Sequence, residues 1–270
     1  MTGFVHDAIF AADSFERVPP VLVCLLGHFR LLKLGEPLMV RSGGRTERLL
    51  CILALARGQV IRRESLIDEI WPSGEPALAG QCLNSLVHSV CKPLRNVLAG
   101  EPAILHEGGC YRLNLRAGVE VDVMRFEALF QAGNQYASGG NADAAMTAYR
   151  GAVDLHGGDL YVCADVSGVV ERERLYALNL TALARLAELS FQNLDYDSGL
   201  GYAFRLLARD HCREDAYRMA MRCYTRRGER AQALRQYRLC CEILRSEFGA
   251  TPEPATTELY DQVRLRPEQV

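Results

Sequence analysis

Three short apolar runs near the start of the chain have the length and punctuation of β-strands. Each is bounded by glycine or proline, which favours turns between antiparallel neighbours. The runs cover residues 21–26, 29–34 and 38–40, with turns at Gly27-His28 and Gly35-Glu36-Pro37. We therefore predict a small antiparallel sheet that has little surface to bury by itself.

Apolar positions three and four residues apart come next and predict helices. The first predicted helix covers residues 45–56 and ends before Gly58, and the second covers residues 64–71 and ends before Pro72. A third helix is predicted over residues 80–98. Its apolar stripe consists of Leu83, Leu86, Val87, Val90, Leu94, Val97 and Leu98.

The opposite face of the helix predicted over residues 80–98 is polar and basic. No acidic residue occurs between Ala77 and Gly100. The outer residues are Asn84, Ser85, His88, Ser89, Lys92 and Arg95. Such a face suits the major groove of DNA, which admits one α-helix. The alternative is an ordinary surface helix whose polar side simply faces water.

A β-hairpin is predicted directly after the third helix, with strands at residues 103–105 and 111–115 and a turn at residues 106–109. Three helices followed by a hairpin are the element order of a winged helix-turn-helix. In that arrangement the third helix enters the major groove and the hairpin leans on the neighbouring backbone or minor groove. We expect base edges to be read by Asn84, Ser85, His88, Ser89 and Lys92, and phosphates to be met by Arg95, Arg45, Arg63 and Arg112.

From residue 119 onward strands vanish from the pattern and helical stripes take over. Several positions of the helical pattern are each followed, 34 residues later, by a corresponding position. The pairs are Leu183 and Tyr217, Ser190 and Tyr224, Gly199 and Ala233, Ala203 and Tyr237, and Leu206 and Cys240. An earlier copy spans residues 133–152, and residues 157–169 are interpreted as an insertion. This period is typical of tetratricopeptide repeats, in which stacked helix pairs form a concave protein-binding surface. A plain helical bundle without a ligand is the alternative.

Composition and charge add a modest asymmetry. The chain has 270 residues and a net charge of −2. Residues 19–119 carry 12 Lys and Arg against 8 Asp and Glu, whereas residues 120–270 carry 18 against 22. This split fits a first module that touches phosphate and a second that touches protein.

The ten cysteines form no CxxC pair and have no zinc-finger spacing from histidines. Most lie on apolar stripes, such as Cys51, Cys91, Cys223 and Cys240, so we expect buried, reduced thiols and no metal or other cofactor. The six histidines occur without a nucleophile elbow, metal-ligand spacing or a glycine-rich phosphate loop. No catalytic residue is therefore predicted, and an enzyme is the poorest interpretation.

No run of 18 apolar residues occurs, so no membrane span is predicted. Residues 1–19 contain His6, Asp7, Asp13 and Glu16, do not resemble a secretory signal, and end at Pro19-Pro20. We treat them as an N-terminal extension and expect a cytoplasmic protein.

The first domain resembles the OmpR-type winged helix. The residues that carry this resemblance are VIRRESLIDEIWP at residues 60–72, LRNVL at residues 94–98 and GGCYRL at residues 108–113. Three positions depart from the family pattern. Pro93 stands where the family commonly has a DNA-contacting arginine, Glu107 where the wing tip is usually basic, and Cys110 in place of a glycine.

The second domain is similar to the bacterial transcriptional activation domain, most clearly over residues 213–260 and also at residues 121–130, 145–161 and 171–178. This pairing of domains is the layout of the SARP regulators (Streptomyces antibiotic regulatory proteins). The resemblance covers residues 20–265. It implies a transcription activator that binds repeated elements of double-stranded DNA near a promoter and contacts RNA polymerase, and it allows a homodimer on DNA.

The expected fold is thus mainly α, with an N-terminal α+β winged helix-turn-helix followed by an all-α tetratricopeptide-like domain. The expected domains are an N-terminal extension at residues 1–19, a winged-helix DNA-binding domain at residues 20–118 and an activation domain at residues 119–265. A second hypothesis is a protein-interaction adaptor whose winged helix has lost DNA binding. Pro93, Glu107 and the acidic total motivate it.

Overall fold

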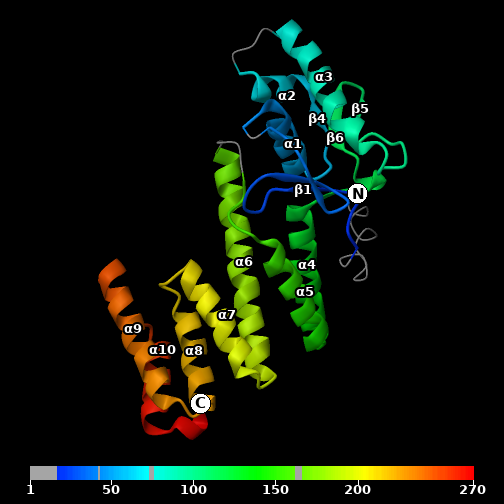
Figure 1. The fold of residues 1–270 in the computed structure, drawn as a ribbon. Coiled ribbons are helices and arrows are strands. Elements are labelled where there is room, and N and C mark those ends of the chain that lie inside the picture. The colour runs from blue at the N-terminus through cyan, green and yellow to red at the C-terminus, as the bar shows by residue number, and fades with distance from the viewer. Residues whose placement is uncertain (1–16, 42, 73–75, 162–165) are drawn as a thin grey trace, which may run out of the picture. The chain divides into compact units, whose positions relative to one another are not determined.

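The computed structural model describes residues 17–41, 43–72, 76–161 and 166–270. Small sheets near the N-terminus are followed by helices (Figure 1), so the predicted fold class is confirmed. The chain forms two compact units. The first combines the residues up to Leu129 with Asp154–Leu175, and the second combines Phe130–Val153 with Tyr176–Val270.

The predicted N-terminal sheet is present in the first unit. Its strands are β1 (Val21–Cys24), β2 (Arg30–Lys33), β3 (Glu36–Leu38) and β7 (Val119–Val121), in the order β3-β2-β1-β7. Strands β1, β2 and β3 are antiparallel neighbours, as expected. The turn before β3 lies at Leu34-Gly35, where φ is +50° and +84°, so β3 begins two residues earlier than the predicted third strand.

The prediction that strands end before Val119 is wrong. Strand β7 pairs in parallel with β1, and Val21 lies opposite Val119. Its three residues alternate buried, half-buried and buried. So short a run cannot be told from the start of a helical stripe by spacing alone. Only the pairing with a strand almost one hundred positions earlier makes it a strand.

The three predicted helices and the hairpin complete the winged helix. The helices are α1 (Arg45–Leu55), α2 (Arg63–Ile70) and α3 (Pro76–Leu94). A second sheet, ordered β4-β6-β5, contains β4 (Ile61–Arg62), β5 (Ile104–Glu107) and β6 (Cys110–Leu113). The hairpin β5–β6 turns at Gly108-Gly109, where φ is +56° and +75°. Strand β4 was not predicted, because two residues carry no periodicity. Leu49, Leu53, Leu66, Leu83 and Leu94 are fully buried.

Helix α3 is displaced toward the N-terminus relative to the prediction. It spans Pro76–Leu94 rather than residues 80–98, and the chain turns over residues 95–100. Pro93 therefore lies in the last helical turn, where the missing N–H of proline removes one backbone hydrogen bond but only one helical residue follows. The Nζ of Lys33 donates a 2.8 Å hydrogen bond to the Pro93 carbonyl, which satisfies one of the free acceptors at this helix end.

Helices build the rest of the chain. They are α4 (Asp122–Ser138), α5 (Ala142–Leu155), α6 (Val166–Gln192), α7 (Tyr196–Arg209), α8 (Glu214–Arg226), α9 (Arg230–Phe248) and α10 (Pro254–Leu265). Short 3-10 turns, η2 (Leu115–Ala117) and η3 (Pro267–Gln269), complete the elements. The buried Gly199 faces the Sγ of Cys223 so closely that a Cβ would lie 3.0 Å from it. Small residues thus stand where helices meet, as a tetratricopeptide-like domain requires.

Part of the predicted insertion at residues 157–169 joins the winged-helix unit. The N–H of Tyr161 donates to the Leu25 carbonyl at 2.7 Å, and the N–H of Gly27 donates to the Asp159 carbonyl at 2.9 Å. Leu26 and Leu160 form a β-bridge. Residues 162–165 lie outside the described residues, and α6 begins at Val166.

The buried Asp122 anchors the end of β1 to the start of α4. Its carboxylate accepts hydrogen bonds of 2.8–2.9 Å from the backbone N–H groups of Leu25 and Leu26. It also accepts from the N–H of Val123 at 2.8 Å. Because only 3% of the residue is exposed, burial raises the pKa of Asp122 to about 6 despite these donors.

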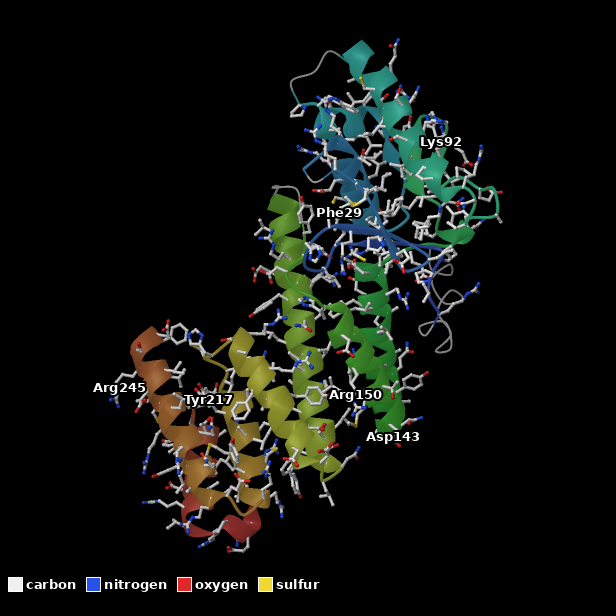
Figure 2. The ribbon with its side chains drawn as sticks, in the orientation of Figure 1. Phe29, Lys92, Asp143, Arg150, Tyr217 and Arg245 are labelled. Carbon is white, nitrogen blue, oxygen red and sulfur yellow. The ribbon has the colours of Figure 1, made fainter. Side chains whose placement is uncertain are left out.

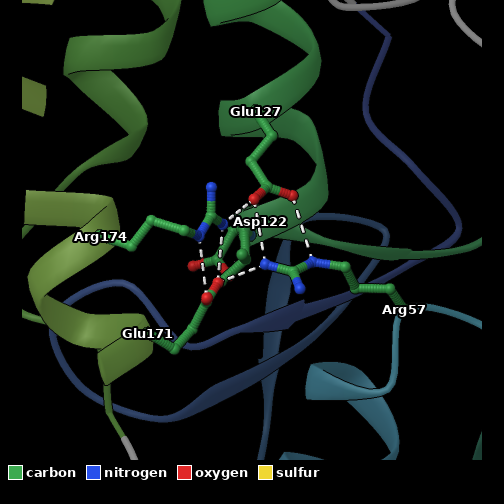
Figure 3. Close-up of polar contacts among 6 residues, drawn as sticks. Arg57, Asp122, Glu127, Glu171 and Arg174 are labelled. Carbon is green, nitrogen blue, oxygen red and sulfur yellow. Dashed lines mark hydrogen bonds and ion pairs between the residues drawn. The ribbon is translucent and has the colours of Figure 1, made fainter. Parts of the chain in front are cut away.

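An ion network ties the end of α1 to α4 and to the start of α6 within the same unit (Figure 3). Arg57 pairs with Glu127 and Glu171, and Arg174 pairs with the same two carboxylates. Arg57 has a left-handed φ of +50°. The two arginines lower the pKa of Glu171 against the opposing effect of burial.

Among the described residues no helix is long and apolar enough to cross a membrane. Cys51, Cys223 and Cys240 are buried and Cys91 is half-buried, while Cys82 is exposed. All nine cysteines in the described part are free thiols. Residues 1–16 of the predicted N-terminal extension lie outside the described residues.

Candidate nucleic-acid interface

The outward face of α3 gathers the predicted base-reading side chains. Asn84, Ser85, His88, Ser89 and Lys92 are all exposed, while Leu83, Val90 and Leu94 on the opposite face are buried (Figure 2 labels Lys92). Leu86 and Val87 are half-buried at the border between the faces. The helix thus presents hydrogen-bonding groups and a cation to solvent along one side.

Asn84 is held in place by a polar contact that joins three elements. The Nη1 of Arg63, at the start of α2, donates to the Oδ1 of Asn84 at 3.0 Å and to the hydroxyl of Tyr111 at 2.9 Å. The Nη2 of Arg63 donates to the Gly80 carbonyl at 2.6 Å. Tyr111, in β6, is 1% exposed and also donates to Asn84 at 3.3 Å. Arg63 therefore fixes the register between α2, α3 and the hairpin.

The two serines of α3 bond to their own helix. The Oγ of Ser85 donates to the Gln81 carbonyl at 3.2 Å, and the Oγ of Ser89 donates to the Leu86 carbonyl at 2.7 Å. Each hydroxyl keeps its lone pairs free to accept. In this conformation the serines therefore suit a base-edge donor such as an exocyclic amine.

A hollow separates α3 from the hairpin β5–β6 and has a volume of about 410 Å³. His106 on β5 stacks on Tyr111 with the ring centroids 4.2 Å apart. The hollow is lined by Asn84, Val87, His88, Cys91, Lys92, Arg95, Pro102, Ile104, His106 and Tyr111. Four of the predicted site residues, Asn84, His88, Lys92 and Arg95, thus share this hollow with His106, which the sequence pattern assigned only to a turn.

The four predicted phosphate-contacting arginines have different settings. Arg95 follows the end of α3 and its Nε donates to the Gly100 carbonyl at 3.1 Å. Arg45, at the start of α1, is exposed and lies over the Trp71 ring at 5.4 Å from its centroid. Arg112 is half-buried on β6, and Arg63 makes the contacts described above. Their roles at DNA stay predictions.

The wing tip carries a negative charge at the edge of the interface. Glu107 is exposed at the end of β5, directly before the turn Gly108-Gly109. Cys110 begins β6 and is half-buried. Because a carboxylate repels phosphates, the hairpin tip is less suited to a phosphate contact than the face of α3.

Comparison with known proteins places the helical part of the chain in one family. The family described as bacterial transcriptional activator domain matches residues 121–264. The chain is also 26% identical over 231 residues to the regulatory protein DnrI of Streptomyces peucetius, a match that covers 81% of this chain and 83% of that protein. The resemblance to SARP-type regulators is thereby confirmed.

A solved structure of Mycobacterium tuberculosis EmbR in complex with a low-affinity phosphopeptide superimposes with a TM-score of 0.69 at 20% sequence identity. The match covers 93% of this chain and 68% of the EmbR chain. At that identity the likeness concerns the fold. It extends over both the winged helix and the helical repeats.

Proposed function

This chain belongs to the bacterial transcriptional activator domain family, and on that premise we propose that it binds promoter DNA through its winged helix and contacts RNA polymerase through its helical repeats. The family is one of transcriptional regulators and not of enzymes. What we propose is that DNA and RNA polymerase are the partners, and which residues contact them.

The observation that carries the proposal is the exposed polar face of α3. A helix whose outer side is free to enter a groove needs its inner side buried, and Leu83, Val90 and Leu94 provide that packing. Asn84 is held by Arg63 and Tyr111. Such pre-organisation reduces the entropy that would be lost when the side chain meets a base.

In the proposed complex α3 lies in the major groove. Asn84, Ser85, His88, Ser89 and Lys92 then reach base edges, and each well-placed bidentate pair discriminates by about 1–3 kcal/mol. Arg95, Arg45, Arg63 and Arg112 lie nearer the phosphates and supply affinity that falls with salt. The small net positive charge of residues 19–119 favours weak binding by one copy. Repeated DNA elements bound by two copies would compensate for that weakness.

The direct test starts with DNA fragments selected by the full chain from a genomic library. Anisotropy titrations of a selected duplex then compare the unaltered chain with Lys92→Ala plus Arg95→Ala. We expect a loss of about tenfold or more and a salt dependence shallower by one or two phosphate contacts. Arg238→Ala plus Arg245→Ala is the matched control, because both arginines are exposed on α9. Equal losses in the two doubles would reject α3 as the reading element.

The proposed polymerase contact needs a separate measurement. Pull-down of purified RNA polymerase holoenzyme by the chain on its DNA, and stimulation of transcription from that template, are the expected results. A chain that binds the DNA and leaves transcription unchanged would reject the activator role and keep the DNA-binding role.

The exposed Glu107 at the wing tip favours one alternative, an adaptor whose winged helix docks protein. Retention on DNA resin at low salt separates the two. The activator is retained and elutes with rising salt, whereas the adaptor passes through.

A further inference from the structure

A second hollow lies in the helical repeats. It has a volume of about 530 Å³ and is open to solvent on one side. Its walls come from the second half of α6, from α7, from the start and middle of α8 and from α10. All of its lining residues belong to the second compact unit. We call this hollow the repeat groove.

Four arginines line the repeat groove: Arg185, Arg213, Arg218 and Arg222. Two acidic residues, Glu188 and Asp215, accompany them. The lining thus has an excess of positive charge in a domain that is acidic overall. A groove that is locally positive within an acidic domain favours an anionic ligand.

Arg185 is the cation that is available to such an occupant. Its side chain is exposed on α6, and within the described part of the chain it makes no hydrogen bond or ion pair. The guanidinium has five N–H donors in a planar fork, which fits a carboxylate with two parallel hydrogen bonds. A compact ammonium could not offer that geometry.

The other three arginines are paired but retain donors. Arg213 donates to Asp215 through Nε and Nη2 at 3.0 and 2.6 Å. Arg222 donates to Glu188 through Nη2 at 2.7 Å, and its buried Nε has no partner in the described structure. Arg218 donates to Glu253 through Nη1 at 3.1 Å. These pairs hold the guanidinium groups in fixed positions with free N–H groups remaining.

Apart from Thr181, apolar side chains form the rest of the lining. They are Ala184, Ala187, Leu206, Ala216, Met219 and Leu259. The small alanines leave room for a side chain from outside, and Met219 can adapt its shape to that side chain. An occupant that combines a carboxylate with a neighbouring apolar side chain would satisfy both parts of the groove.

We propose that the repeat groove binds an acidic peptide segment of a partner protein, in which Asp or Glu side chains meet Arg185 and its neighbours and an apolar residue packs between the alanines. The volume is within the usual range for a binding pocket. This inference deepens the proposed function, because it gives the chemistry of the segment that the activation domain holds. The inference depends on the proposed function only for the identity of the partner protein.

The experiment uses the full chain and a fluorescein-labelled peptide of repeating Glu-Glu-Leu-Leu sequence. Anisotropy should show saturable binding that weakens as salt rises, and the matching Gln-Gln-Leu-Leu peptide should bind far less. Arg185→Glu should weaken binding by about tenfold, and Arg185→Gln by a smaller factor. Arg245→Glu, the same charge reversal on the exposed face of α9, should change it less than twofold.

Several outcomes would overturn the proposal: no saturable binding, equal binding of the glutamine peptide, or equal loss in the Arg185 and Arg245 variants. Displacement of the peptide by duplex DNA would also overturn it, since the two ligands would then share one surface. Arg185→Glu should bind the selected DNA duplex as tightly as the unaltered chain. Failure of the groove is thus measured separately from failure of DNA binding.

Discussion

Arg57 and Glu127 are 70 positions apart in the chain and share two hydrogen bonds, Nε to Oε2 at 3.2 Å and Nη2 to Oε1 at 3.0 Å. Arg57 lies two residues after the end of α1, the first helix of the winged helix, and Glu127 belongs to α4. The contact joins segments that the sequence assigned to different domains. It brings the start of the activation domain into the compact unit of the winged helix.

The interaction between Arg57 and Glu127 should contribute measurably to the free energy of unfolding of the first unit. In a double-mutant cycle of Arg57→Gln and Glu127→Gln we expect a coupling free energy of about 1 kcal/mol, because Glu127 is only 19% exposed. Urea unfolding of the four proteins measures it. The control cycle is Arg264→Gln with Asp261→Asn, an ion pair in which both side chains are at least half exposed. Its coupling should be a few tenths of a kcal/mol. Equal couplings would show that the Arg57 network adds nothing beyond a surface pair.

Asp122 should make stability depend on pH in the direction set by its raised pKa. The folded pKa of about 6 lies above the ordinary value near 4 of an aspartate. Its contribution to the free energy of unfolding is therefore full below about pH 4, and about 3 kcal/mol is lost as the pH rises through 6. Asp122→Asn removes the titration. It also leaves buried N–H donors facing an amide, so this variant should be less stable throughout.

The measurement is the difference in unfolding free energy between the unaltered chain and Asp122→Asn at several pH values. We expect this difference to shrink as the pH rises from about 4 to about 7. A difference that grows over this range would mean that the three backbone donors outweigh burial and hold the pKa low.

Gly133 should tolerate no side chain. A Cβ at this position would lie 2.6 Å from two ring carbons of Tyr149, whose hydroxyl is fixed by a 2.7 Å hydrogen bond to Asn134. Gly133→Ala is expected to cost about 1–3 kcal/mol of stability. Gly201→Ala is the matched control, because Gly201 is helical, exposed and has no neighbour within 4 Å of the new Cβ. That substitution should stabilise by up to about 1 kcal/mol. Thermal unfolding of both variants decides the matter, and a harmless Gly133→Ala would reject the close approach of α4 and α5.

Tyr111→Phe should weaken DNA binding with little effect on the fold. The substitution keeps the buried ring and its stacking on His106 but removes the hydroxyl that contacts Arg63 and Asn84. Asn84 would then be less well fixed, and we expect affinity for the selected duplex to fall about threefold to tenfold. Tyr217→Phe, at a buried tyrosine of the second unit, is the control and should leave DNA affinity unchanged. Unchanged affinity in Tyr111→Phe would remove this contact from the proposed interface.

The local elements could be predicted from the sequence because their patterns are local. The stripe through Leu83, Val90 and Leu94 gave the inner face of α3 correctly, and the glycines at 108 and 109 marked the hairpin turn. The ends of α3 could not be predicted well, since LRNVL continues the apolar spacing although the chain already turns.

The long-range contacts could not be predicted in the same way. Strand β7 needs β1, and Asp122 and Glu127 look like ordinary acidic residues of an amphipathic segment until their partners are placed. Likewise, the alternation of charges at residues 171–174 resembles a solvated helix face. In the structure Glu171 and Arg174 belong to a network with Arg57. Spacing along one helix holds no information about a partner more than one hundred residues away.

The unit that contains the winged helix is discontinuous along the chain, and this limits how the protein can be divided or recombined. A chain cut after residue 118 would lack β7, Asp122 and residues 157–161, and would expose the amide groups of Leu25 and Leu26. Transfer of the winged helix to another protein would need to include α4, α5 and the first turns of α6. Recombination between related genes would therefore yield a folded protein more often if it exchanged all residues up to 175 than if it exchanged the winged helix alone.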